Sequence, residues 1–107
     1  MVGVFTTEGF DRRIRRLKDR QGRLRILERI DRLAHGNPGD TKSVGQGVLE
    51  LRLTYGPGYR VYYATQGDRV VLLLCGGDKS TQQRDIGMAQ QLAADWRSEE
   101  KDDDEED

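Results

Sequence analysis

The stretch GVLELRLTYGPGYRVYY, from Gly47 to Tyr63, decides the fold. Apolar and polar residues alternate from Val48 to Tyr55 and again from Tyr59 to Ala64, and a period of two predicts strands that are buried on one face. The Gly-Pro-Gly between them predicts a tight turn. The run from Val70 to Cys75 is apolar throughout, which predicts a central strand covered on both faces. We therefore expect a three-stranded antiparallel meander here.

The alternation also predicts which side chains share a face of this sheet. One face is expected to be apolar, and the other to carry charged and aromatic groups. The first face would hold Leu49, Leu51, Leu53, Tyr55, Tyr59, Val61 and Tyr63, and the second Glu50, Arg52, Arg60 and Tyr62. If helices cover the apolar face, the polar side chains would form a shallow open groove.

The first half of the chain predicts one strand and two helices. A β-prone segment, Val2 to Thr6, is followed by Thr7, which can cap a helix with the apolar stripe Phe10, Ile14 and Leu17. Gly22 interrupts that pattern. The second helix is expected to end at the loop signal His35 to Gly39. Its apolar stripe would consist of Leu24, Leu27, Ile30, Leu33 and Ala34.

The remaining segments complete an α+β domain with its helices packed on one sheet face. Residues 40–46 lack periodicity and are expected to form a surface loop. A last helix, capped by Ser80 or Thr81, would carry Ile86, Ala89, Leu92, Ala93 and Trp96. We expect one domain over residues 1–98 and a disordered acidic tail over 99–107, where no apolar residue occurs.

Composition excludes several classes of protein. The apolar run Val70 to Cys75 is too short to cross a membrane, and the N-terminus lacks the pattern of a secretory signal. The single cysteine, Cys75, excludes an internal disulfide and a multi-cysteine metal site. We expect a cytoplasmic protein that needs no metal or other cofactor.

Charge is divided unevenly along the chain. Residues 99–107 contain eight acids and one lysine, a net charge of −7, which leaves the body with a net charge of +6. Ten basic residues, nine of them arginine, lie between Arg12 and Arg32, a pattern typical of RNA-binding surfaces. A solvated helical face explains the same pattern. The acidic tail is either solvated or folds back onto the basic helices. The candidate RNA-binding residues here are Arg12, Arg16 and Arg23.

Candidates for chemistry are few. His35, the only histidine, is expected at the surface, and Cys75 in the core, so neither predicts a nucleophilic site. The polar sheet face, with Arg52, Arg60 and Tyr62, suits a phosphodiester, because cations stabilise a phosphorane and a tyrosine can stack on a base. The alternative is a surface ion network in which these arginines pair with Glu50 and Asp85.

Two segments resemble a known family. GVLELRLTYGPGYRVYY and LLLCGGDKSTQQRDIGMAQQLAADW, from Leu72 to Trp96, resemble the RelE/ParE superfamily of bacterial toxins, and within it the HigB-like addiction-module killer proteins. The resemblance covers about residues 2–97. It implies a microbial-ribonuclease-like fold and a toxin encoded beside a cognate antitoxin. Members with nuclease activity enter the ribosomal A site and cut mRNA through attack of the 2′-hydroxyl, without a metal.

The resemblance also assigns residues. Arg60, in Tyr-Arg-Val, is similar to the arginine that contacts the scissile phosphate. Lys79, Gln82, Arg84 and Asp85 occupy the segment whose polar residues assist, and Lys79 is a candidate base. The general acid and base stay open, since the histidines of some relatives are missing. Two alternatives remain: a ParE-like gyrase inhibitor without nuclease activity, and a non-toxic RNA-binding module.

Overall fold

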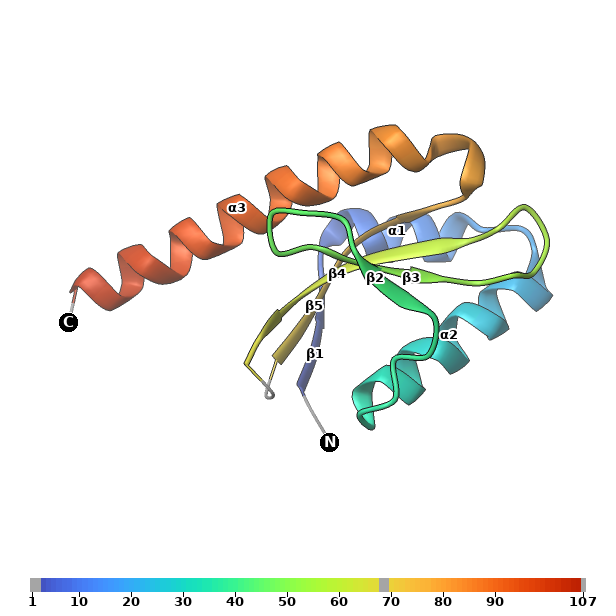
Figure 1. Cartoon of the computed structure of the whole chain (residues 1–107), viewed down its shortest axis with the longest axis horizontal. Coiled ribbons are helices and arrows are strands. Elements are labelled where there is room, and N and C mark those ends of the chain that lie inside the picture. Colours follow the sequence, from blue (N-terminus) through green and yellow to red (C-terminus); the bar gives the residue numbers. More distant parts are fainter. Residues whose placement is uncertain (1–2, 68–69, 107) are drawn as a thin grey trace.

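The computed structural model describes residues 3–67 and 70–106. It is an α+β domain with a five-stranded mixed sheet, so the predicted fold class is confirmed (Figure 1). The strand order is β1-β5-β4-β3-β2, with β1 parallel to β5 and the other neighbours antiparallel. The elements are β1 (Gly3–Thr6), α1 (Glu8–Arg16), α2 (Arg20–Ala34), β2 (Thr41–Ser43), β3 (Leu49–Arg52), β4 (Arg60–Gln66), β5 (Val70–Gly77), a 3-10 turn η1 (Lys79–Thr81) and α3 (Gln82–Glu106).

The sheet is wider than the sequence predicts. Residues 40–46 were expected to form a loop, but Thr41–Ser43 pairs antiparallel with β3, so the antiparallel run has four strands instead of three. This strand lies at the sheet edge, is only three residues long and is mostly exposed. A short polar edge strand has no apolar alternation, and its conformation is determined by its partner.

Helices α1 and α2 cover one face of the sheet. Their buried side chains Phe10, Ile26 and Ile30 pack against Leu51 and Val61 in a continuous apolar core. The sheet side chains on this face are those that alternation predicted. Thr7 caps α1 as expected: its Oγ1 accepts a hydrogen bond from the Phe10 amide at 3.1 Å and donates one to the Leu74 carbonyl at 2.6 Å. The second bond fastens α1 to β5.

The apolar stripe predicted for α2 is partly wrong. Leu24 and Leu27 are exposed, whereas Ile26, Ile30 and Leu33 are buried. Three residues of an α-helix turn about 300°, which is about 60° less than a full turn. Two side chains nine residues apart therefore lie on opposite sides of the helix. Leu24 and Leu33 therefore cannot share one face.

Helix α3 lies on the opposite face, so the expectation that all helices pack on one face is wrong. Its Ala89 and Ala93 pack against Tyr62, Ala64 and Leu74 in a second core. Periodicity shows which side of a helix is apolar but not which face of a sheet it covers. The apolar stripe predicted for α3 itself is confirmed by its contacts with this core.

A β-bulge shapes the centre of the sheet. Tyr63 pairs with Leu73 and Tyr62 with Cys75, so Leu74 is one extra residue on β5. Two consecutive residues, Leu74 and Cys75, consequently face α3. Beyond the bulge, Gly76 faces α1 and Gly77 faces the first turn of α3.

Helix α3 continues past the sheet and its acidic end leads away from it (Figure 1). The backbone of residues 99–106 is helical, in contrast to the predicted disordered tail, and Asp107 lies outside the described residues. Extending an existing helix needs no new nucleus, so the segment can follow α3 without apolar contacts of its own. Among the described helices, none has the length and apolar character that crossing a membrane requires.

Candidate nucleic-acid and catalytic site

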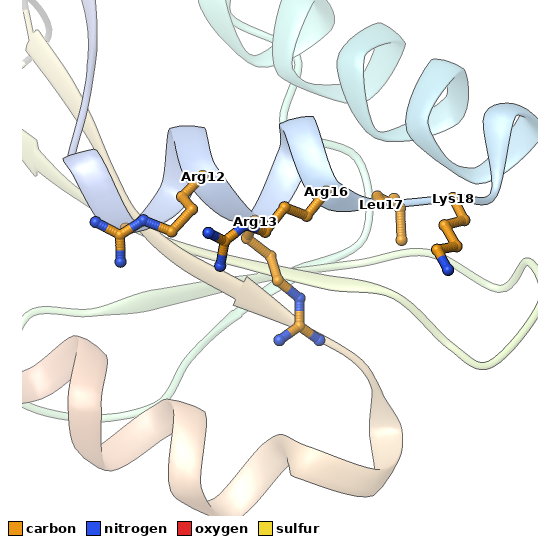
Figure 2. Close-up of a pocket in the computed structure, with 6 residues that line it drawn as sticks. Arg12, Arg13, Arg16, Leu17 and Lys18 are labelled. Atoms are coloured by element: carbon orange, nitrogen blue, oxygen red, sulfur yellow. The ribbon is translucent and has the colours of Figure 1, made fainter.

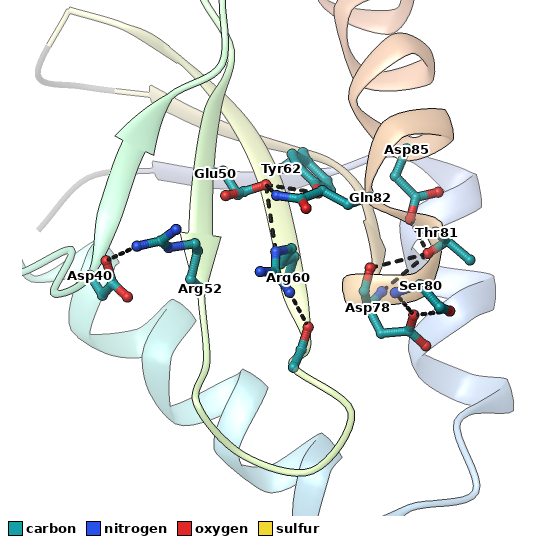
Figure 3. Close-up of polar contacts among 11 residues, drawn as sticks. Asp40, Glu50, Arg52, Arg60, Tyr62, Asp78, Ser80, Thr81, Gln82 and Asp85 are labelled. Carbon is teal, nitrogen blue, oxygen red and sulfur yellow. Dashed lines mark hydrogen bonds and ion pairs between the residues drawn. The ribbon is translucent and has the colours of Figure 1, made fainter.

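A buried polar cluster lies between the sheet and the start of α3. We call it the Glu50 network: Glu50, Arg60, Tyr62 and Gln82 (Figure 3). Glu50 Oε2 accepts hydrogen bonds from the Tyr62 hydroxyl at 3.0 Å and from Gln82 Nε2 at 2.9 Å. Arg60 Nε lies 3.7 Å from the same oxygen. The expected open groove is therefore wrong here, because α3 covers this part of the polar face and Glu50 and Tyr62 are fully buried.

Arg60 is held from its inner side. Its side chain is 12% exposed, Nε faces the Glu50 carboxylate, and Nη1 donates to the Gly58 carbonyl at 2.6 Å. Nη2 has no hydrogen-bond partner in the part of the chain that the structure describes. Among the described residues Nε makes no hydrogen bond, so the Nη1 hydrogen bond and the ion pair with Glu50 together restrict the orientation of the guanidinium, and Nη2 can serve a ligand.

Tyr62 does not act as a base-stacking residue, so that prediction is wrong. Its ring is buried and its hydroxyl points at Glu50 (Figure 3). Burial, followed by the hydrogen bond to Glu50, raises the pKa of the Tyr62 phenol well above its ordinary value. Gln82 likewise donates a hydrogen bond to Glu50, but it is only half-buried and borders a surface hollow with Lys79 and Arg84.

Lys79 lies beside Arg60, as the resemblance implies. The Lys79 amide donates to the Pro57 carbonyl at 3.4 Å, which brings η1 against the β3–β4 turn. Gly58 lies between the Arg60 guanidinium and the base of the Lys79 side chain: a Cβ there would be 3.1 Å from Arg60 Nη1 and 3.4 Å from Lys79 Cβ. Since φ of Gly58 is +78°, glycine suits this position both sterically and conformationally.

Asp78 organises the turn that carries Lys79. Its carboxylate accepts hydrogen bonds from the Ser80 amide at 2.8 Å and from the Ser80 hydroxyl, and these contacts lower the pKa of Asp78. Asp78 is thus the cap of η1, and Thr81 completes the capping box by accepting a hydrogen bond from the Asp78 amide at 3.2 Å. The acidic residue before Lys79 is committed to local structure.

Arg84 and Asp85 have different surroundings. Arg84 is 68% exposed and borders a surface hollow of about 330 Å³ together with Lys79. The Asp85 carboxylate is buried, accepts a hydrogen bond from Thr81 Oγ1 at 2.5 Å, and lies against Gly77 (Figure 3). Arg84 can therefore reach a ligand, whereas the predicted catalytic role of Asp85 is not supported by its inward position.

The structure contains part of the ion network that the sequence offered as an alternative: Arg60 pairs with Glu50, but Arg52 pairs with Asp40. Arg52 is the cross-strand partner of Arg60, but its Nη2 lies 3.4 Å from Asp40 Oδ1. Arg60 pairs with Glu50, and Arg84 Nε lies 3.9 Å from Asp85 Oδ1. The Arg52 and Arg84 pairs are at least partly exposed and hold these arginines weakly, so both can exchange a carboxylate for a phosphate.

The basic residues between Arg12 and Arg32 are not one surface. Arg12 and Arg16 border a hollow of about 420 Å³ with Arg13 and Lys18, which we call the α1 hollow (Figure 2). Its remaining lining residues are Gly9 and Leu17. Arg23 lies on α2 and is not among them.

Two of the basic residues serve the fold. Arg29 donates to the carbonyls of Arg52 at 2.7 Å and Pro38 at 3.0 Å, and Arg25 lies 4.6 Å above the Tyr55 ring. Composition cannot separate such structural arginines from those available to a ligand.

His35 lies at the surface and Cys75 in the core, as the sequence predicts. His35 is exposed at the end of α2, where Nδ1 lies 2.8 Å from the Asp31 carbonyl. Cys75 is buried, and its burial raises the pKa of the thiol to about 12. Within residues 3–67 and 70–106, no three His, Cys, Asp or Glu side chains group as metal ligands.

Comparison with known proteins identifies the family of this chain. The pattern of the phage-derived Gp49-like proteins matches residues 13–93, which is more than half of the chain. The chain belongs to the Gp49-like family. An uncharacterized protein of Haemophilus influenzae is 49% identical over 92 residues, which cover 86% of this chain and 93% of that protein. The Gp49-like region contains the Glu50 network, Lys79 and Arg84, but neither Arg12 nor the acidic end of α3.

Proposed function

We propose that this Gp49-like protein is the toxin of a type II toxin–antitoxin pair, and that it cleaves mRNA on the ribosome. The observation that carries the proposal is Arg60, oriented by Glu50 and Gly58 beside the exposed cation Lys79. The resemblance of residues 47–63 and 72–96 to the RelE/ParE superfamily supports it. The partners would be a cognate antitoxin, the ribosome and mRNA in the cytoplasm.

The reaction uses the RNA's own nucleophile. The 2′-oxygen forms a bond to phosphorus while the bond to the 5′-oxygen breaks, which yields a 2′,3′-cyclic phosphate and a 5′-hydroxyl end. Arg60 would stabilise the charge that develops on the phosphorane. The 2′-hydroxyl must lose a proton and the 5′-oxygen must gain one. Lys79 is the side chain we assign to proton transfer, because it is exposed and adjacent to Arg60.

The buried partners act through Arg60. Glu50 is fully buried and cannot contact RNA, so we assign it as a positioning residue. Holding a guanidinium in one orientation before the substrate arrives removes part of the entropy loss on reaching the transition state. Asp85 is assigned as a positioning residue for η1, because it accepts a hydrogen bond from Thr81.

The test is induction of the protein without an antitoxin, with mapping of mRNA 5′ ends. The wild type should cut within translated regions. Arg60→Lys keeps the charge beside Glu50 but loses the planar fork, so cleavage should fall by about 10²–10³-fold while the protein remains folded. Arg32→Lys, on the exposed last turn of α2, is the control and should cleave normally. Full cleavage by Arg60→Lys would refute the assignment.

A ParE-like gyrase inhibitor is the second candidate. It is favoured by the low exposure of Arg60 and its ion pair with Glu50, which fit a purely structural arginine. That function predicts DNA damage without mRNA cleavage on induction, and unchanged toxicity of Arg60→Lys. RNA binding without growth arrest would instead indicate a non-toxic module.

A further inference from the structure

Arg13 differs from the other basic residues of α1. Arg12, Arg13 and Arg16 border the α1 hollow, but the Arg13 side chain extends toward the end of β5 and the start of α3 (Figure 2). The sequence gives no reason to separate Arg13 from its neighbours Arg12 and Arg16. The fold does so, because the hydrogen bond from Thr7 to Leu74 fixes α1 along β5.

Arg13 connects the α1 hollow with the candidate site. It borders a groove of about 400 Å³ between α1 and α3, whose other cation is Arg84. It also borders a small, mainly apolar recess that reaches Arg60, Gly76 and Gly77 and is otherwise lined by Phe10, Ile14, Leu17, Ile26, Tyr59 and Val61. The two glycines present no side chain at this end of β5. Arg13, Arg60 and Arg84, which belong to three different elements, therefore all lie near the C-terminal end of β5.

The charges around Arg13 leave it available. Two carboxylates border the same groove: Glu8, whose Oε1 lies 3.6 Å from Arg12, and Asp85, which is bonded to Thr81. Arg13 itself has no ion pair within the described ranges. Its charge also lowers the pKa of Asp78, after the larger effects of the hydrogen bonds from Ser80 and Thr81. Arg13 thus acts electrostatically on the turn that carries Lys79.

We infer that the α1 hollow and Arg13 form a phosphodiester subsite, which holds the backbone of single-stranded RNA beside the phosphate bound at Arg60. This inference rests on the proposed function and adds the path of the strand. Arg12, Arg16 and Lys18 contact the flanking backbone, and Arg13 contacts the phosphate nearest to Arg60. Arginine forks suit such contacts because they bind phosphate oxygens in pairs.

The test measures binding separately from cleavage. The probe is a 2′-O-methyl oligoribonucleotide, which lacks the nucleophilic hydroxyl, titrated against the full-length protein at several salt concentrations. Arg13→Gln should weaken binding and reduce the slope of log K against log salt by about 0.7, the value for one phosphate of a single strand. Arg32→Gln is the matched control, since Arg32 is also exposed but lies at the far end of α2.

The outcomes separate this subsite from the proposed nuclease. An unchanged slope for Arg13→Gln would overturn the subsite, and so would an equal loss for Arg32→Gln. Tighter binding of an oligo-glutamate peptide of the same charge would assign the hollow to an acidic protein and also overturn it. Arg13-dependent binding by a wild type that leaves mRNA intact on translating ribosomes would support the subsite and refute the nuclease.

Discussion

The two faces of the sheet are built on different principles. The face under α1 and α2 is apolar and is filled by large side chains such as Ile26, Ile30 and Leu51. The face under α3 combines small residues, Ala89 and Ala93, with a buried carboxylate and its cationic partner. Among the described residues, the charged side chains that are buried, Glu50 and Asp85, lie on the second face.

This difference separates stability from function. Apolar burial stabilises a fold without specifying chemistry, at about 25 cal/mol for each Å². A buried ion pair contributes little net stability, because desolvation offsets its attraction, but it fixes the orientation of both groups. The α1/α2 face therefore supplies most of the stability of the domain, and the α3 face orients the Arg60 guanidinium.

The largest effect is expected from breaking the ion pair on the α3 face. Arg60→Ala leaves the Glu50 carboxylate buried without its cation, so the free energy of unfolding should fall by about 3–5 kcal/mol in urea denaturation at pH 7. This loss is the reason to test function with Arg60→Lys.

A second substitution tests whether the unpaired charge of Glu50 causes this loss of stability. Adding Glu50→Gln to Arg60→Ala removes the buried charge and should restore most of the stability, while cleavage stays absent. A double variant as unstable as the single one would mean that packing, and not the unpaired charge, is responsible.

A somewhat smaller effect is expected from the apolar face. Ile26→Ala leaves a cavity and should lower the free energy of unfolding by about 2–5 kcal/mol, measured in the same way. Leu24→Ala is the control, two residues away but 58% exposed, and should change it by less than about 0.5 kcal/mol. Equal effects would contradict the orientation of α2.

The smallest effect concerns the edge of that face, where the Tyr59 hydroxyl donates to Asp19 at 2.7 Å. Hydrogen bonds from the Gly22 amide and Tyr59 lower the pKa of Asp19, so they stabilise the fold above pH 3.8, and this contribution is lost as the pH falls through the lower folded value. Tyr59→Phe should lower Tm by a few degrees at pH 7.

The pH profile distinguishes this bond from lost packing. The difference in Tm between wild type and Tyr59→Phe should shrink as the pH falls from 3.8 through the lower pKa that Asp19 has in the folded protein. Burial raises the pKa of Tyr59 to about 12, so the difference should also shrink between pH 10 and 12. A difference independent of pH would contradict the role of the hydrogen bond.

Sequence alone predicts the sheet faces well and the site only in part. Alternation along residues 48–64 identifies which side chains meet α1 and α2, because a strand has a strict period of two. It does not show that α3 covers the other face, which is why Tyr62 was expected in an open groove. Arg13 also escapes prediction, since its surroundings come from the docking of α1 on β5 and not from its neighbours in the chain.

The extra residue at Leu74 has a consequence for how this strand tolerates change. A regular β5 of the same sequence would turn Cys75 toward Phe10 and set Gly76, not Gly77, opposite Arg60. It would also shift η1 along the strand relative to Gly58. The number of residues between Leu73 and Lys79 thus constrains the fold as much as their identity does. Inserting or deleting one residue there would turn the following side chains to the opposite face of the sheet.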